Sequence, residues 1–135
     1  MKLFSSIFKG NNHEGKLKID WIPLTEKNQI DAIIELSKTK PVLIFKHSTR
    51  CGVSSMALRR FEENYDLEAK QLDLYFLDLL NFRALSNEIA IKFQVPHQSP
   101  QVIVIQKGKI IYHDSHYQIN VEKMKKVLSF QPIVS

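Results

Sequence analysis

The sequence predicts one α/β domain in which a mixed β-sheet is flanked by α-helices on both faces. Two apolar runs of strand length, around residues 41–46 and 72–78, enclose a segment with helical periodicity. Two further strand patterns near the C-terminus are separated only by Lys107 and Gly108, the spacing of a tight hairpin. A strand–helix–strand connection makes parallel neighbours and a hairpin makes antiparallel ones, so the sheet should contain both.

Residues 19–135 are expected to form this domain, preceded by a flexible lead-in over residues 1–18. The lead-in is polar and rich in Gly and Asn after a short apolar beginning, which is typical of mobile chain. The chain has 135 residues, of which 44% are hydrophobic and 24% charged, enough for one hydrophobic core. Residues 19–24 are expected to add an edge strand.

The first helix is expected after Thr25, whose hydroxyl is suited to capping a helix N-terminus. Apolar residues at helical spacing then share one face: Ile30, Ile33 and Ile34. The helix should end before Pro41, where a continuous apolar strand begins. Because this strand does not alternate with polar residues, it should be covered on both faces and lie at the centre of the sheet.

A second helix is expected from Cys51 to about Asn64. Its inward positions would be Val53, Met56, Ala57 and Phe61. The residues left in solvent would be Arg59, Arg60, Glu62 and Glu63. The only cysteine therefore lies at the junction between the central strand and a helix.

The second half of the chain continues the same pattern. After the strand at 72–78, Asn81 is expected to cap a helix whose apolar residues are Phe82, Leu85, Ile89, Ala90 and Phe93. Residues 95–100 interrupt this helix, and the hairpin strands are expected at 101–106 and 109–113. Asn120 should cap a last helix.

The single cysteine excludes an intrachain disulfide and a self-contained multi-thiolate metal site. No metal ligand set is visible, because the histidines lack ligand spacing. A reducing, cytoplasmic setting is expected, and no export or membrane-spanning segment is recognisable. The net charge is +5, but the basic residues are scattered without a nucleic-acid motif, so neither nucleic acid nor membrane is an expected partner.

Cys51 is the candidate nucleophile because it lies at the first turn of a helix that leaves a central strand. The positive end of the helix dipole and the unpaired N–H groups of the first turn, at Gly52 and Val53, favour the thiolate. The neighbouring Arg50 would add to this effect. An isolated cysteine is often only a small buried hydrophobe, and this is the alternative reading.

Ser54 stands three residues after Cys51, where a dithiol enzyme would place a second cysteine. Its hydroxyl is expected to donate a hydrogen bond to the Cys51 sulfur and so to stabilise the thiolate. Serine cannot resolve a mixed disulfide, so an external thiol would have to release Cys51 by exchange. The sequence thus predicts a monothiol mechanism.

Ser99 and Pro100 form the second feature, directly before the hairpin strands. A cis bond is plausible at this place, although X-Pro bonds are cis in only about 5–6% of folded cases. A trans proline that merely ends the loop is the alternative. His97 could lie near Cys51, and His47 could point toward it.

These residues resemble the thioredoxin-like superfamily, and more narrowly the monothiol bacilliredoxins of the bacillithiol system, the YtxJ-type family. The resemblance covers about residues 20 to 130. It is carried by the stretch Ile44 to Cys51, by the monothiol motif Cys51-Gly52-Val53-Ser54, and by His97-Gln98-Ser99-Pro100-Gln101 before the hairpin.

The resemblance implies that Pro100 is cis and faces Cys51, and that Ser99, Pro100, His47 and His97 line the substrate site. It also implies removal of bacillithiol from protein mixed disulfides by the Cys51 thiolate. The partners would be bacillithiolated client proteins, bacillithiol as the low-molecular-weight thiol co-substrate, and a disulfide reductase. No bound cofactor or metal would be needed.

Two alternatives remain open at this point. The family commonly has proline where Gly52 stands, and Cys-Gly-x-Ser also resembles monothiol glutaredoxins, which use glutathione and can share an iron–sulfur cluster. Such a protein would be expected to carry Thr-Val-Pro before the hairpin, whereas this chain has Gln98-Ser99-Pro100. It would also be expected to carry Gly-Gly-x-x-Asp after the hairpin, which this chain lacks. The other alternative is a non-catalytic thioredoxin-like binding module in which Cys51 is incidental.

Overall fold

The computed structural model describes residues 19–130, which form five strands and four α-helices. The expected lead-in over residues 1–18 lies outside the described residues. In chain order the elements are β1 (Ile22–Pro23), α2 (Asn28–Leu36), β2 (Val42–His47), α3 (Gly52–Asn64), β3 (Asp73–Asp78), α4 (Arg83–Phe93), β4 (Gln101–Gln106), β5 (Lys109–Ser115), the short 3-10 helix η1 (His116–Gln118) and α5 (Val121–Phe130).

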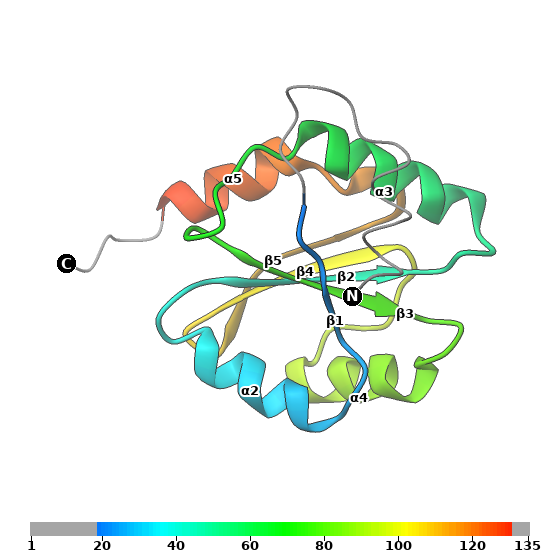
Figure 1. Cartoon of the computed structure of the whole chain (residues 1–135), viewed down its shortest axis with the longest axis horizontal. Helices are drawn as coiled ribbons and strands as arrows, with labels where there is room; N and C mark the ends of the chain where they lie inside the picture. The colour runs from blue at the N-terminus through cyan, green and yellow to red at the C-terminus, as the bar shows by residue number, and fades with distance from the viewer. Residues whose placement is uncertain (1–18, 131–135) are drawn as a thin grey trace.

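The strands form one mixed sheet in the order β1-β3-β2-β4-β5. β1 and β2 both run parallel to β3, whereas β4 is antiparallel to β2 and β5 is antiparallel to β4. Helices α3 and α5 cover one face of the sheet, and α2 and α4 cover the other (Figure 1). The predicted fold class is therefore confirmed, including the edge strand within residues 19–24.

The two kinds of strand pairing have local causes. β2 and β3 are joined through α3, a crossover that only parallel strands need. β4 and β5 are joined by Lys107 and Gly108, both at positive φ, 54° and 75°. Two consecutive residues at positive φ make the primed turn whose twist matches that of a hairpin.

The alternating side chains of the central strands supply two hydrophobic layers. On the α3 and α5 side, Leu43 and Phe45 of β2 pack with residues such as Phe61 and Met124. On the α2 and α4 side, Val42 and Ile44 pack with residues such as Ile33 and Ile89. All six residues of β2 are buried, as expected for a strand covered on both faces.

The helix caps differ from the expectation in two of three cases. Thr25 does not cap α2, because the Gln29 side chain instead accepts the N–H groups of Thr25 and Glu26, at 2.7 and 2.9 Å. Asn81 does not cap α4, because its amide donates to the Asp78 carboxylate at 2.7 Å. Asn120 does act as predicted, since its side-chain oxygen accepts the Lys123 N–H at 2.9 Å.

The predicted inward face of α3 is only partly correct. Met56 is 60% exposed, and the buried residues of the helix are Ser54, Ala57 and Phe61. Glu62 is half-buried rather than in solvent, because its carboxylate accepts the Trp21 indole N–H at 2.9 Å. The environment of the Glu62 carboxylate is thus set by Trp21, which lies 41 positions away in the sequence.

No helix among residues 19–130 combines the length and the apolarity that crossing a membrane requires.

Candidate active site

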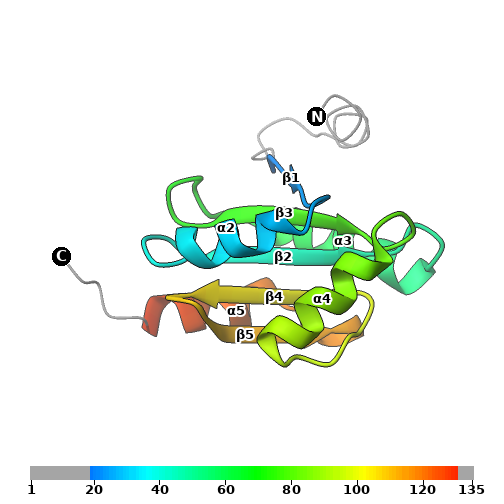
Figure 2. The same cartoon turned by 90° about the horizontal axis from the view of Figure 1, so that it is seen from below.

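Three segments meet at one edge of the sheet, and two of them carry predicted site residues. β2 ends at His47 and leads to Cys51, and the parallel strand β3 ends at the same edge, where α4 begins. β4 runs the opposite way, so its first residue, Gln101, pairs with Lys46 near the end of β2. Figure 2 shows the strands in sheet order, with β1 and β5 at the two sides. The topology therefore brings Cys51 and the Ser99–Pro100 segment to a common edge.

Cys51 is the N-cap residue of α3 and is half-exposed. Its backbone is extended, with φ −109° and ψ 119°; its N–H donates to the Ser48 carbonyl and its own carbonyl accepts the Ser55 N–H, both at 3.1 Å. No acidic residue lies in the first turn of α3. Cys51 therefore stands at the positive end of the dipole of a 13-residue helix.

The residues around Cys51 differ in exposure. Arg50 and Gly52 are exposed, and Val53 is half-buried. A Cβ added to Gly52 would meet nothing within 4 Å. The space beside Gly52, the residue that follows Cys51, is consequently open.

Ser54 does not bond to the Cys51 sulfur as the sequence suggested. Its buried hydroxyl instead accepts the Ser48 N–H at 3.0 Å and lies 2.8 Å from Nδ1 of His47. Burial lowers the pKa of His47, and the Asp78 carboxylate only partly opposes this shift. The neutral imidazole can accept the hydroxyl hydrogen at Nδ1. Ser54 thus joins the first turn of α3 to the end of β2 and to the loop that precedes Cys51.

His47 lies on the α3 side of the sheet, within the aromatic part of the core. Its ring lies 5.4 Å from that of Phe76, measured between centroids. Phe45 and Trp21 continue this cluster, with Trp21 5.5 Å from Phe76 and 5.8 Å from Phe45. His47 is therefore buried next to the site and does not line an exposed substrate surface.

Lys46 points to the opposite side of the sheet, toward α4. It is fully buried, and its Nζ donates to the Ser86 carbonyl at 3.5 Å. Ser86 is also buried, and its hydroxyl lies 2.9 Å from Nδ1 of His97. A chain of polar contacts thus runs from β2 through α4 to the loop before Pro100.

The electrostatics of this chain are set by burial and by a nearby guanidinium. Burial, together with the positive charge of Arg83, lowers the pKa of Lys46 to about 8. Burial also lowers the pKa of His97, and the charges of Lys46 and Arg83 act in the same direction. At pH 7 the ammonium of Lys46 is therefore still charged, while His97 is biased toward its neutral form.

The Ser99–Pro100 peptide bond is cis. Pro100 is buried, and its carbonyl accepts the His116 N–H at 3.0 Å. The buried Gln101 donates to the Pro96 carbonyl at 3.1 Å. Within residues 19–130 the buried Ser99 hydroxyl has no hydrogen-bond partner. Hydrogen bonds made by Pro100 and Gln101 thus fix the Ser99–Pro100 segment. It lies at the edge of the sheet that also carries Cys51.

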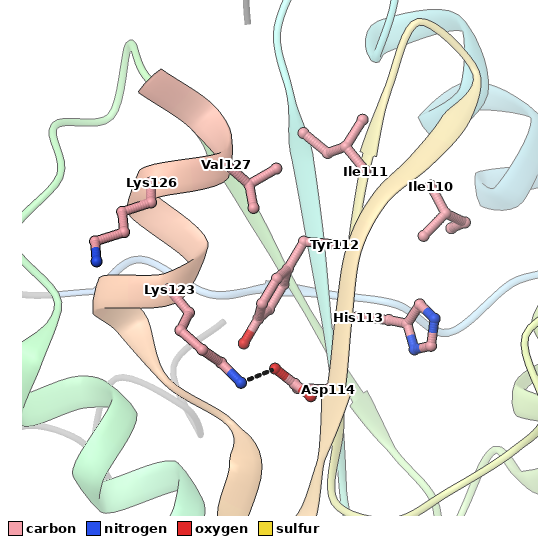
Figure 3. Close-up of a pocket in the computed structure, with 8 residues that line it drawn as sticks. All are labelled: Ile110, Ile111, Tyr112, His113, Asp114, Lys123, Lys126 and Val127. Carbon is pink, nitrogen blue, oxygen red and sulfur yellow. Dashed lines mark ion pairs between the residues drawn. The ribbon is translucent and has the colours of Figure 1, made fainter. Parts of the chain in front are cut away.

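The described residues hold no group of three or more His, Cys, Asp or Glu side chains arranged to bind a metal ion. A groove of 480 Å³ lies between β5 and α5 (Figure 3). Asp114 and Lys123 form an ion pair in it at 2.9 Å, and residues 110–113, Lys126 and Val127 complete its lining. Since Cys51 does not line this groove, the groove is separate from the thiol site.

A family model described as monothiol bacilliredoxin BrxC matches residues 22–124. The chain belongs to this family. The matched range includes Cys51, Ser54, His97 and Pro100. The sequence-based resemblance to monothiol bacilliredoxins is thereby confirmed, and with it a place among thioredoxin-like thiol oxidoreductases.

Solved structures support the fold of this bacilliredoxin. A protein described provisionally as an oxidoreductase with a thioredoxin fold is 32% identical, with a TM-score of 0.67 over 78% of this chain and 91% of its own. Thioredoxins from Malassezia sympodialis and Trypanosoma brucei brucei are 18% and 19% identical, both with a TM-score of 0.62 over 87% of this chain and 96% of their own. The predicted thioredoxin-like fold is confirmed.

Sequence reasoning did not find every residue of the bacilliredoxin site. Ser86 was not singled out from the sequence, yet it connects Lys46 with His97. The available signal was Lys46 itself, a charged residue inside an otherwise apolar strand. A lysine in such a strand needs a polar partner, because burying an unpaired charge is unfavourable.

Proposed function

We propose that this chain removes bacillithiol from protein mixed disulfides through the Cys51 thiolate. The observation that carries the proposal is the position of Cys51, a lone thiol at the N-cap of α3, half-exposed at the edge of the sheet where the Ser99–Pro100 segment lies. Membership in the monothiol bacilliredoxin family supports the choice of bacillithiol.

The first step is a thiol–disulfide exchange. The Cys51 thiolate attacks the bacillithiol sulfur, so a bond forms between these two sulfurs while the bond to the client cysteine breaks. The client cysteine leaves as a thiolate and takes a proton from water. The exposed Gly52, with open space around it, leaves room beside Cys51 for a bulky protein disulfide. Because Ser54 stands three residues after Cys51, the first turn of α3 contains no second thiol.

The second step releases Cys51. A second bacillithiol thiolate attacks the bacillithiol sulfur on Cys51, giving bacillithiol disulfide and the free Cys51 thiolate. A disulfide reductase would then reduce that product. Residues 19–135 would act as one domain. The compartment that suits this cycle is the cytoplasm, because thiols are kept reduced there.

The test uses one client protein in two forms, bacillithiolated and glutathionylated, each mixed with the reduced protein. Intact mass spectrometry follows which adduct moves to Cys51. We expect transfer of bacillithiol, and its absence would contradict the proposal. Preferential transfer of glutathione would instead favour a glutaredoxin activity.

Cys51→Ser is the matched control. Serine is a good N-cap residue, so this variant should keep α3 and the fold, which circular dichroism can check. Loss of transfer with an intact fold is expected. Transfer that persists in the variant would overturn the role of Cys51.

A further inference from the structure

Three cationic or titratable side chains gather where α4 meets the end of β2. Lys46 contacts Ser86 of α4, and Ser86 holds Nδ1 of His97. Arg83, the first residue of α4, lies one helical turn before Ser86 and is close enough to influence both Lys46 and His97 electrostatically. The three groups therefore form one cluster, which we call the α4 cationic cluster.

Within the part of the chain that the structure describes, no carboxylate neutralises this cluster. Among the ion pairs within residues 19–130, none involves Lys46, Arg83 or His97. From the described residues the ammonium of Lys46 receives one hydrogen-bond partner, a neutral carbonyl at 3.5 Å, although its side chain is fully buried. Buried charges in folded proteins are normally paired. Since residues 19–130 supply no counter-charge, the cluster is suited to binding an anionic ligand.

The cluster lies at the edge of the sheet that carries Cys51. Arg83 begins the helix that follows β3, Lys46 is next to the last residue of β2, and His97 precedes the Ser99–Pro100 bond by two residues. Arg83 is exposed and His97 is half-exposed, so both are open to a ligand. Ser86 holds Nδ1 of His97, which leaves the Nε2 edge of the ring for contact.

We propose that Lys46, Arg83 and His97 bind an anionic group on the low-molecular-weight thiol that Cys51 takes up. This inference rests on the proposed function and adds the chemical class of the thiol. Arg83 and His97 would contact the anionic group directly. Lys46 is buried, so its charge would attract the group without direct contact. Because the contacts are partly exposed, the effect should be moderate and should weaken in salt.

The test uses three mixed disulfides of one client cysteine whose small thiols differ in the charge of their terminal group. The small thiols are 3-mercaptopropionate, which is anionic, 2-mercaptoethanol, which is neutral, and cysteamine, which is cationic. Single-turnover rate constants for uptake of each thiol by Cys51 are measured by intact mass. We expect the anionic thiol to be taken up about threefold to tenfold faster than the neutral one, with cysteamine slowest. The preference should shrink in 0.5 M sodium chloride.

Two variants locate the preference within the cluster. Arg83→Gln and Lys46→Met should each lower the ratio of the anionic to the neutral rate constant at least twofold. Arg59→Gln is the matched control, since Arg59 is also exposed but lies in the middle of α3. Arg83→Gln is a surface change, so it provides a test that does not depend on repacking around residue 46.

The outcomes separate the two proposals. Uptake of all three thiols at equal rates would overturn the anion site and leave the thiol-transfer function standing. A preference that persists in both variants, or that Arg59→Gln removes equally, would overturn the assignment to this cluster. No uptake of any thiol would overturn the thiol-transfer function and the anion site together.

Discussion

The Ser54 hydroxyl lies 2.8 Å from Nδ1 of His47 and also accepts the Ser48 N–H at 3.0 Å. Both Ser54 and His47 are buried. One hydroxyl therefore fixes the helix start, the end of the central strand and the loop that leads to Cys51. The Ser54 side chain therefore fixes the backbone around Cys51 and does not contact the sulfur.

Ser54→Ala should destabilise the protein and slow thiol transfer. The change leaves the part-buried Ser48 N–H and the buried His47 Nδ1 without this partner, a loss that costs about 1–3 kcal/mol. The free energy of unfolding is measured by urea denaturation, and transfer by intact mass. Ser55→Ala is the control because Ser55 is exposed in the same turn. Equal effects of the two changes would contradict a specific role for the Ser54 hydroxyl.

Lys46→Met should raise the free energy of unfolding at pH 7, by up to about 3 kcal/mol. The pKa of Lys46 falls from 10.5 to about 8 in the folded protein, and each unit corresponds to about 1.4 kcal/mol. At pH 7 lysine is protonated in both the folded and unfolded states, so the folded protein carries the full cost of the buried charge. Methionine removes this cost while filling similar space.

The stabilisation by Lys46→Met should decrease as the pH rises. Between pH 8 and pH 10.5 the unfolded wild type binds more protons at this residue than the folded one does, so wild-type stability gains with pH relative to the variant. Urea denaturation of both proteins at pH 7 and pH 10 gives the two differences. Lys109→Met, at an exposed position of β5, should show no such trend. A pH-independent difference for Lys46→Met would contradict the charge-burial argument.

Gly52→Ala should stabilise the protein by about 0.5–1 kcal/mol, because glycine in a helix is entropically unfavourable. The added Cβ has open space around it, so no clash offsets the gain. The same Cβ adds bulk to the residue that follows Cys51, so transfer from a protein mixed disulfide should slow more than transfer from a small-molecule disulfide. Thermal denaturation measures the stability, and intact mass spectrometry measures the transfer rates. Equal slowing of both substrates would show that the open space at Gly52 does not serve protein substrates.

Asn120→Ala should cost about 1 kcal/mol, the usual value for an N-cap whose side chain bonds to the backbone. Its side-chain oxygen accepts the Lys123 N–H at the start of α5. Thr25→Ala should change stability by less than about 0.5 kcal/mol, since Thr25 is exposed and its hydroxyl caps nothing. Urea denaturation of the two variants makes the comparison, and a larger loss for Thr25→Ala would reverse this assignment of caps.

The sequence alone determined the elements and the position of the thiol. Hydrophobic periodicity, the apolar run before Lys46 and the Lys107-Gly108 turn are short-range features that act within a few residues. They were sufficient to predict the mixed sheet and the placement of Cys51 between β2 and α3. Caps were less predictable, because Gln29 and Asp78 supply hydrogen bonds that changed the roles of Thr25 and Asn81.

Only the tertiary structure decided which polar groups meet at the site. Lys46 and Ser86 are 40 positions apart, and Trp21 and Glu62 are 41 apart. Even Ser54 and Cys51, three residues apart, were paired wrongly from sequence, because His47 offers the Ser54 hydroxyl a buried partner. The physical reason is that periodicity fixes which face a side chain occupies. Its partner depends on the packing of elements that are distant in the chain, and on the burial that makes an unpaired polar group costly.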